Sequence, residues 1–159
     1  QQDVIDNMGK LNAAHPLVDT YHGTNGFVLS PGLNQPIMVT RKDVATVQLA
    51  KGAIRAGIDI LLEAAGVTAE SLDQFLIAGA FGTYISVESA IEIGMFPALP
   101  LDRFDQIGNA AGMGAWMLLS NTAYREQVAT LDVNYIELTA YRDFQNKFME
   151  QMYLGAEIT

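Results

Sequence analysis

The longest regular pattern of apolar positions runs from residue 44 to residue 65, where apolar residues recur at intervals of three and four, as on one face of a helix. They are Val44, Val47, Ala50, Ile54, Ile58, Leu61, Leu62 and Ala65. Thr40, followed three residues later by Asp43, resembles a capping box, and Gly66 is a typical stop. The pattern therefore predicts one long amphipathic helix that ends at Gly66.

Shorter apolar runs predict strands. Runs at residues 27–29 and 37–39 predict a hairpin, and the rest of residues 7–36 is rich in Asn, Gly and Pro and predicts loop. Residues 73–78 are followed by Gly79 and are almost wholly apolar towards their end, which is typical of a parallel strand covered on both faces. Residues 133–138 predict a further strand.

Four more segments have helical patterns. They are residues 87–93, 109–119, 121–129 and 140–152, the last with Thr139 as its predicted cap. The segment 109–119 is apolar nearly all round, so we expect it to be buried on several sides, with Trp116, Met113 and Met117 in the core. Strands alternate with helices along the chain, which indicates an α/β fold.

Composition narrows the class of protein. Half of the 159 residues are apolar and 17% are charged, which suits one folded domain. The formal charge of −9 disfavours nucleic acid and anionic membranes as partners. The chain has no cysteine, so it cannot ligate an iron–sulfur cluster through thiolates. Without a signal-peptide pattern or a transmembrane stretch we expect a cytoplasmic protein, and the start at Gln1 rather than Met suggests a fragment.

The segment 76–82 carries the first candidate site. A strand ended by Gly79 and Gly82 presents unhindered backbone at the carboxyl edge of a sheet, where ligands of open α/β folds bind. The alternative is a tight strand-to-helix turn without a ligand. The spacing is not the dinucleotide fingerprint, which needs three glycines.

A second glycine pair lies inside a predicted helix. Gly112 and Gly114 each cost about 1 kcal/mol relative to alanine in a helix, so a compensating close contact is expected. Ordinary helix packing and direct contact with a ligand are both consistent with this pattern.

Three segments in order, residues 40–57, 76–82 and 108–115, resemble the carboxyl-terminal part of the reductive activators of corrinoid proteins. These are iron–sulfur ATPases of the acetate and sugar kinase, heat-shock chaperone and actin superfamily. The resemblance extends from about residue 4 to residue 154. It implies an actin-like (ribonuclease H-like) ATPase lobe with a mixed sheet flanked by helices. It also implies that the [2Fe-2S] domain, the middle domain and the first lobe lie outside residues 1–159.

The resemblance assigns roles to particular residues. Gly79, Ala80 and Gly82 correspond to the adenosine motif, in which the usual adjacent glycine pair is here Gly79-Ala80. The segment 108–115 is similar to the second connecting motif, a small-residue helix that serves as the hinge between lobes. Its proposed hinge residues are Gly108, Asn109, Gly112 and Gly114.

Two basic residues are further candidates for the nucleotide site. Lys51 and Arg55 lie one turn apart on the long helix of a chain with only 9 basic residues, so they suit the ribose or phosphates of a nucleotide. The alternative is that they are solvated or salt-bridged surface residues.

No catalytic residue and no metal site is assigned. Asp59 and Glu63 are one turn apart, and we interpret them as part of a solvated helix face. His15, Asp19 and His22 have spacings that a metal site could use, but they lie in a segment interrupted by proline and glycine, so we expect a loop without metal.

The resemblance implies an ATP-dependent activator, using ATP with Mg, that reduces the cobalt of a corrinoid protein from Co(II) to Co(I) in a methyltransferase system. Electrons would come from the [2Fe-2S] cluster of another domain. The expected partner is the corrinoid protein, and a homodimer is compatible. Two alternatives stay open: a docking module for a corrinoid protein that does not hydrolyse ATP, and an activator of another ATP-driven reduction. We expect the fragment alone to be inactive.

Overall fold

A computed structural model describes residues 4–32 and 35–155 of the chain. Its longest element is helix α1 (Arg41–Ala65), roughly 37 Å long at 1.5 Å per residue. The hydroxyl of Thr40 accepts from the N–H of Asp43, and the Asp43 carboxylate accepts from the N–H of Thr40 at 2.8 Å. Gly66 ends the helix in the left-handed conformation at φ 67°. The predicted long helix, its capping box and its glycine stop are confirmed.

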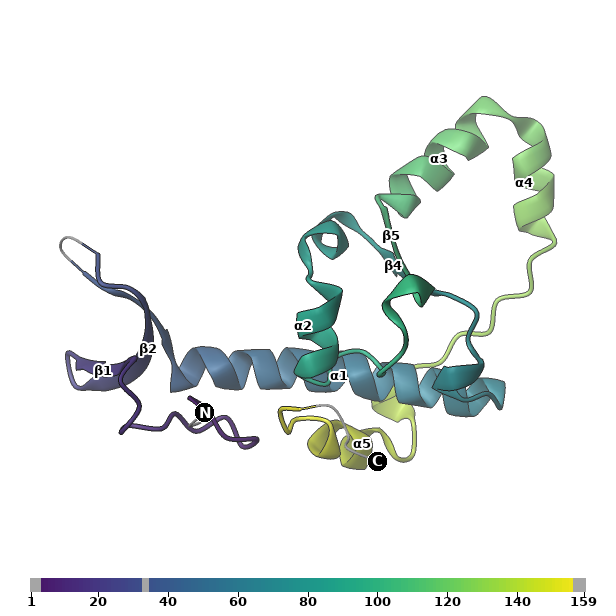
Figure 1. Cartoon of the computed structure of the whole chain (residues 1–159). Coiled ribbons are helices and arrows are strands. Elements are labelled where there is room, and N and C mark those ends of the chain that lie inside the picture. The colour runs from purple at the N-terminus through teal and green to yellow at the C-terminus, as the bar shows by residue number, and fades with distance from the viewer. Residues whose placement is uncertain (1–3, 33–34, 156–159) are drawn as a thin grey trace.

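An antiparallel sheet lies at the amino-terminal end of α1 (Figure 1). It contains β1 (Val18–Tyr21), β2 (Thr24–Ser30) and β3 (Ile37–Thr40) in that order. The predicted hairpin is the β2–β3 pair, in which Phe27 lies opposite Val39. Strand β1 falls in a region predicted as loop. It forms because His22 (φ 49°) and Gly23 (φ 78°) both take positive φ, the geometry of a tight two-residue hairpin turn.

A parallel pair joins β4 (Phe75–Ala78) to β5 (Phe104–Gly108). Strand β4 confirms the prediction at residues 73–78, whereas β5 was not expected. The antiparallel and parallel pairings of the α/β fold lie in two separate sheets of the described residues. The expectation that β4 is covered on both faces is wrong, since Leu76 is 52% exposed while Ile77 is buried. In a sheet of only two strands, an apolar run such as that of β4 shows that one face of the strand is buried, and it does not show that both faces are.

The core lies between α1, the parallel pair and α2 (Val87–Glu92), the predicted helix at residues 87–93. Its buried residues include Ile77 and Phe96. The ring centroid of Phe75 lies 5.2 Å from that of Phe96 and 5.1 Å from that of Phe104. This aromatic cluster connects both parallel strands to the segment after α2, so it sets the position of the strand ends.

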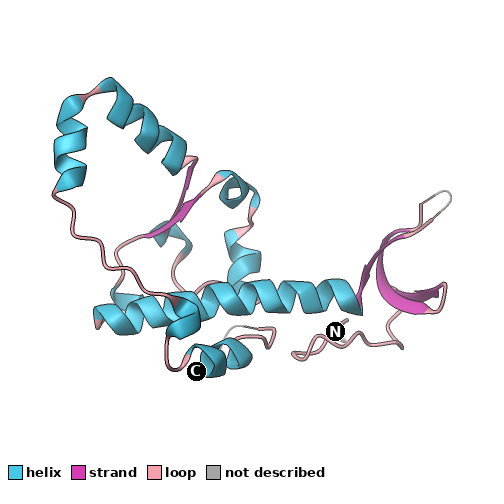
Figure 2. Ribbon diagram, turned by 180° about the vertical axis from the view of Figure 1, so that it is seen from behind, coloured by secondary structure: helices cyan, strands magenta, loops and turns pink. Residues whose placement is uncertain are grey.

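Helices α3 (Ala110–Ser120) and α4 (Thr122–Ala129) follow β5 and project away from α1 (Figure 2). Their bounds agree with the predicted helices. The expected burial of α3 is wrong, because none of its residues is buried. Met113 is 59% exposed and Trp116 64% exposed, and Met117 is only half-buried. The apolar pattern indicates that α3 packs against another surface, but it does not identify that surface.

The carboxyl-terminal helix α5 (Phe144–Glu150) lies on the side of α1 opposite α2 (Figure 1). It is shorter than the predicted helix at 140–152, and the predicted cap is wrong: the hydroxyl of Thr139 donates to the Glu137 carboxylate at 2.9 Å, and Asp143 precedes the helix without a side-chain capping hydrogen bond. The predicted strand at 133–138 does not form. Its Val133 and Tyr135 are 78% and 88% exposed, and the segment has no strand partner among the described residues. Four 3-10 turns complete the elements: Ala69–Ser71, Ala80–Tyr84, Leu101–Arg103 and Leu138–Ala140.

Candidate nucleotide site and hinge helix

Two glycines that contact each other stand at the carboxyl ends of the parallel strands, Gly79 directly after β4 and Gly108 as the last residue of β5. The N–H of Gly79 donates to the carbonyl oxygen of Gly108 at 2.6 Å, just beyond a register shift between the strands. Gly79 has φ 108° and Gly108 has φ 63°, conformations that side chains disfavour. The first predicted nucleotide residue and the first predicted hinge residue therefore meet at the carboxyl edge of β4 and β5, where ligands of open α/β sheets bind.

Residues 79–85, here called the glycine turn, lead from β4 towards α2. The N–H of Gly82 donates to the Gly79 carbonyl at 3.1 Å, and the Thr83 hydroxyl donates to the Ala80 carbonyl at 2.8 Å. Phe81 and Tyr84 are 87% and 88% exposed. The turn is therefore closed by polar contacts, and of its large side chains only Ile85, at its end, packs against the core of the described chain.

The two glycines of the predicted adenosine motif differ in surroundings. An added Cβ at Gly79 would meet no atom within 4 Å, so this glycine borders open space. An added Cβ at Gly82 would lie 2.7 Å from Cγ2 of Ile77, a buried core residue. Both positions have a structural reason to be glycine, Gly79 its positive φ and Gly82 its contact with Ile77, and of the two only Gly79 borders open space that a ligand can reach.

The amino-terminal end of α3 gives a local account of Gly112. The Asn109 side chain caps the helix by accepting from the N–H of Gly112 at 3.0 Å. An added Cβ at Gly112 would lie 2.5 Å from Nδ2 of Asn109, while one at Gly114 would meet nothing within 4 Å. Gly114 is therefore the residue whose small size is unexplained by contacts within the described chain.

Lys51 lies on α1 beside the carboxyl-terminal segment, away from the glycine turn. Its side chain is 1% exposed, and Nζ donates to the main-chain carbonyl of Tyr153. Burial lowers the pKa of Lys51 from its usual value, and the like charge of Arg55 lowers the pKa further. Next to it, Nε2 of Gln48 donates to the carbonyl of Met152 at 3.0 Å. This face of α1 holds the carboxyl-terminal segment.

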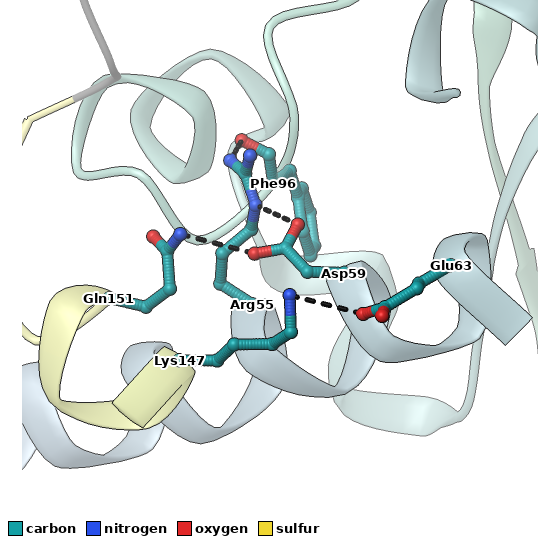
Figure 3. Close-up of polar contacts among 6 residues, drawn as sticks. All are labelled: Arg55, Asp59, Glu63, Phe96, Lys147 and Gln151. Carbon is teal, nitrogen blue, oxygen red and sulfur yellow. Dashed lines mark hydrogen bonds and ion pairs between the residues drawn. The ribbon is translucent and has the colours of Figure 1, made fainter. Parts of the chain in front are cut away.

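Arg55 belongs to a polar network that Figure 3 shows in close-up. Its Nε lies 2.9 Å from Oδ1 of Asp59, and Nη1 donates to the Phe96 carbonyl at 3.4 Å. Nε2 of Gln151 donates to the other Asp59 oxygen at 3.1 Å. Asp59 is therefore partly buried and paired rather than part of a solvated face. The hydrogen-bond partners of Lys51 and Arg55 lie at residues 59, 96 and 153, and none is in the glycine turn.

A second ion pair joins α5 to α1 near this network. Nζ of Lys147 lies 3.2 Å from Oε2 of Glu63 (Figure 3). The hydrogen bond to Glu63 is the largest cause of the raised pKa of Lys147. Within the described residues, no group of three or more His, Cys, Asp or Glu side chains has an arrangement suited to a metal ion. The same residues contain no helix with the length and apolarity needed to cross a bilayer.

Sequence reasoning did not identify Gln106. Its Nε2 donates to the main-chain carbonyls of Gly82 and Ile85, the second at 2.9 Å, so it connects β5 with the glycine turn. The only signal in the sequence is its place two residues before Gly108 in an unexpected strand. A side-chain contact across 24 residues cannot be inferred without knowing that β5 pairs with β4.

The comparison with protein families matches residues 1–158 to the C-terminal domain of RACo, the ASKHA domain. The chain belongs to this family. Over 95% of its length it superposes on the solved structure of a reductive activator for corrinoid, iron-sulfur protein, with a TM-score of 0.80 and 28% sequence identity. The α/β ASKHA fold expected from the sequence is confirmed.

Two curated proteins are similar in sequence to this ASKHA domain. The corrinoid activation enzyme RamQ of Eubacterium limosum is 40% identical over 114 residues, covering 67% of this chain. The [Co(II) methylated amine-specific corrinoid protein] reductase of Methanosarcina barkeri is 33% identical over 84 residues, covering 53% of this chain. The matched regions are 19% and 15% of those proteins, and 25% of the chain in the solved structure.

Proposed function

We propose that this chain is the nucleotide-binding lobe of an ATP-dependent activator that reduces the cobalt of a corrinoid protein from Co(II) to Co(I). The observation that carries the proposal is the glycine contact at the ends of β4 and β5, in a domain of the ASKHA family. The names of these three relatives refer to activation or reduction of corrinoid proteins. The corrinoid protein is accordingly the proposed partner.

The proposed nucleotide contact is made by main chain. Gly79 has no neighbour within 4 Å of an added Cβ, so a nucleoside can approach its backbone closely. Ala80 and Gly82 continue the same turn. Lys51 and Arg55 were also predicted to bind the nucleotide, but the burial of Lys51 and the pairing of Arg55 favour a structural role.

The electron must come from outside this chain. Reduction of Co(II) to Co(I) consumes one electron, and the proposed source is a [2Fe-2S] cluster. The 159 residues contain no cysteine and only two histidines, so they do not fit such a cluster. The role proposed for this lobe is therefore energetic: it binds ATP and changes its arrangement relative to the other lobe, with α3 and residues 108–114 as the hinge.

The test is a paired titration on the intact protein. Calorimetry would give the ATP dissociation constant with and without saturating Co(II) corrinoid protein, and anaerobic spectroscopy would follow formation of Co(I) as ATP is added. We expect ATP to accelerate Co(I) formation and to bind more tightly when the corrinoid protein is present, because coupling between two binding sites is reciprocal. Co(I) formation at the same rate without ATP would contradict the proposal.

One observation favours a second candidate, a docking module that does not hydrolyse ATP. Helix α3 presents Trp116 and Leu119 at 64% and 78% exposure, a surface suited to contact with another protein surface. The same titrations separate the two candidates. A docking module would bind the corrinoid protein with equal affinity whether or not nucleotide is present.

A further inference from the structure

The Gln106 side chain makes two hydrogen bonds that tie β5 to the glycine turn. A side-chain amide nitrogen carries two hydrogens, and Nε2 of Gln106 donates to two carbonyl oxygens, those of Gly82 and Ile85. Both acceptors are main-chain atoms more than 20 residues earlier in the chain. The contact therefore depends on the position of the turn rather than on the identity of its side chains.

These bonds close the far end of the turn, while another bond closes its near end. The N–H of Gly79 donates to the Gly108 carbonyl at 2.6 Å, two residues beyond Gln106 on the same strand. Strand β5 thus holds residues 79, 82 and 85 from one side. Its last residue, Gly108, is followed directly by Asn109, the cap of α3.

Packing contributes less to the position of this turn than it does in the core. Phe81 and Tyr84 are almost fully exposed, and Gly79 borders open space. The inward contacts of the turn are those of Gly82 against Ile77 and of Ile85, at its end, against the buried core. Between Gly79 and Tyr84 no large side chain locks the turn, so the path of the main chain there depends on its hydrogen bonds.

We propose that Gln106 is a positioning residue for nucleotide binding, which holds the glycine turn against β5 so that the backbone at Gly79 meets the nucleoside in a fixed geometry. The proposal rests on the proposed function of the turn. Since Gln106 and the cap of α3 belong to one short segment, the same contact links the nucleotide site to the proposed hinge. Gln106 acts through the turn and makes no contact with the nucleotide itself.

The test uses Gln106→Met and Gln106→Glu in the intact protein. The first has similar length without a donor, and the second is nearly isosteric but at neutral pH presents a carboxylate that cannot donate to the two carbonyls. The matched control is Asp105→Asn, at the adjacent exposed position of β5, where the side chain makes no hydrogen bond within the described residues. Three quantities are measured: the half-saturating ATP concentration for corrinoid reduction, the maximal rate, and amide hydrogen exchange in residues 80–85.

Loss of two hydrogen bonds predicts a rise of about tenfold in the half-saturating ATP concentration, with the maximal rate within about twofold of wild type. Exchange in residues 80–85 should be faster in both variants, and the control should match wild type in all three measurements. A lower maximal rate at unchanged half-saturation would mean that Gln106 supports only the fold, and the positioning role would be rejected.

Two further outcomes separate this inference from the proposed function. If wild type responds to ATP and folded Gln106 variants respond identically, the positioning role fails and the proposed function stands. If wild type shows no ATP response, both fail. Should Met or Glu impair folding, Gln106→Asn keeps the amide but shortens its reach by one methylene, and the same expected shift in half-saturation applies.

Discussion

Nζ of Lys51 donates a hydrogen bond to the main-chain carbonyl oxygen of Tyr153, 102 residues further along the chain. Gln48, one turn earlier on α1, binds the carbonyl of Met152 in the same way. The N–H of Leu154 donates to the carbonyl of Asn7 at 2.8 Å. One face of α1 and the amino-terminal segment thus hold the carboxyl-terminal segment largely through its backbone.

The first prediction concerns the charge of Lys51. Its folded-state pKa is below its usual value of 10.5, so the folded chain binds this proton less tightly than the unfolded chain does. The cost of burying the charge is therefore fully present below the folded pKa and disappears as the pH rises towards 10.5. We expect Lys51→Met to remove this alkaline gain in the free energy of unfolding, measured by urea denaturation between neutral pH and pH 10.5.

Lys147 should affect the pH dependence of stability in the direction opposite to Lys51. Its pKa is raised above 10.5 by Glu63, so its contribution to stability is present below pH 10.5 and is lost as the pH rises through the folded pKa. Lys147→Met should remove an alkaline loss rather than a gain, seen when the urea denaturation series is extended above pH 10.5. Equal pH profiles for the Lys51 and Lys147 variants would contradict both assignments.

The second prediction concerns the start of α1. Hydrogen bonds from Thr40 are the largest cause of the lowered pKa of Asp43, whose usual value is 3.8. The stabilising contribution of Asp43 is present above that value and is lost as the pH falls through the lower folded pKa. Thermal unfolding between pH 2 and pH 6 should therefore show a smaller acid-induced loss in Asp43→Asn than in wild type, and no difference in slope would mean that the capping box does not form.

The third prediction separates the two glycines of the turn. Gly82→Ala should lower the free energy of unfolding by about 1–3 kcal/mol, because its Cβ would crowd Ile77 in the core. Gly79→Ala meets no atom but would place alanine in a backbone region open essentially to glycine, at a cost of about 1–3 kcal/mol, and unlike Gly82→Ala it should weaken ATP binding by the intact protein. Denaturation and calorimetry on both variants check this. Unchanged ATP affinity in folded Gly79→Ala protein would remove Gly79 from the nucleotide site.

The fourth prediction concerns Gly114 of α3. Gly114→Leu should leave the stability of this chain unchanged or raise it by up to about 1 kcal/mol, since the site is open and leucine favours helix. In the intact protein the same change should reduce ATP-stimulated corrinoid reduction, because a bulky side chain would separate the hinge helix from its counterpart. Ala123→Leu on α4 is the control. Full ATP stimulation in the Gly114 variant would show that this position is not at the hinge.

The local elements whose causes lie within a few residues could be predicted from the amino-acid sequence. Helix α1 could be predicted because Thr40, Asp43 and Gly66 supply its cap and stop beside an uninterrupted apolar face. The β2–β3 hairpin and the bounds of α3 followed from the same kind of short-range pattern. The glycines at 79 and 82 marked the candidate site for a similar reason, since they end an apolar strand. Three motifs in order indicated the family.

Features that depend on a partner far away in the chain became visible only in the folded structure. Strand β5 is too polar, with Asp105 and Gln106, to be recognised until β4 supplies its hydrogen bonds. The strand expected at 133–138 had the right composition but found no neighbouring strand in the described chain. Lys51 was predicted to bind a nucleotide, with an exposed surface cation as the alternative, and only the return of Tyr153 to α1 shows that it is buried. Periodicity reports which face of an element is apolar, whereas long-range contacts determine what covers that face.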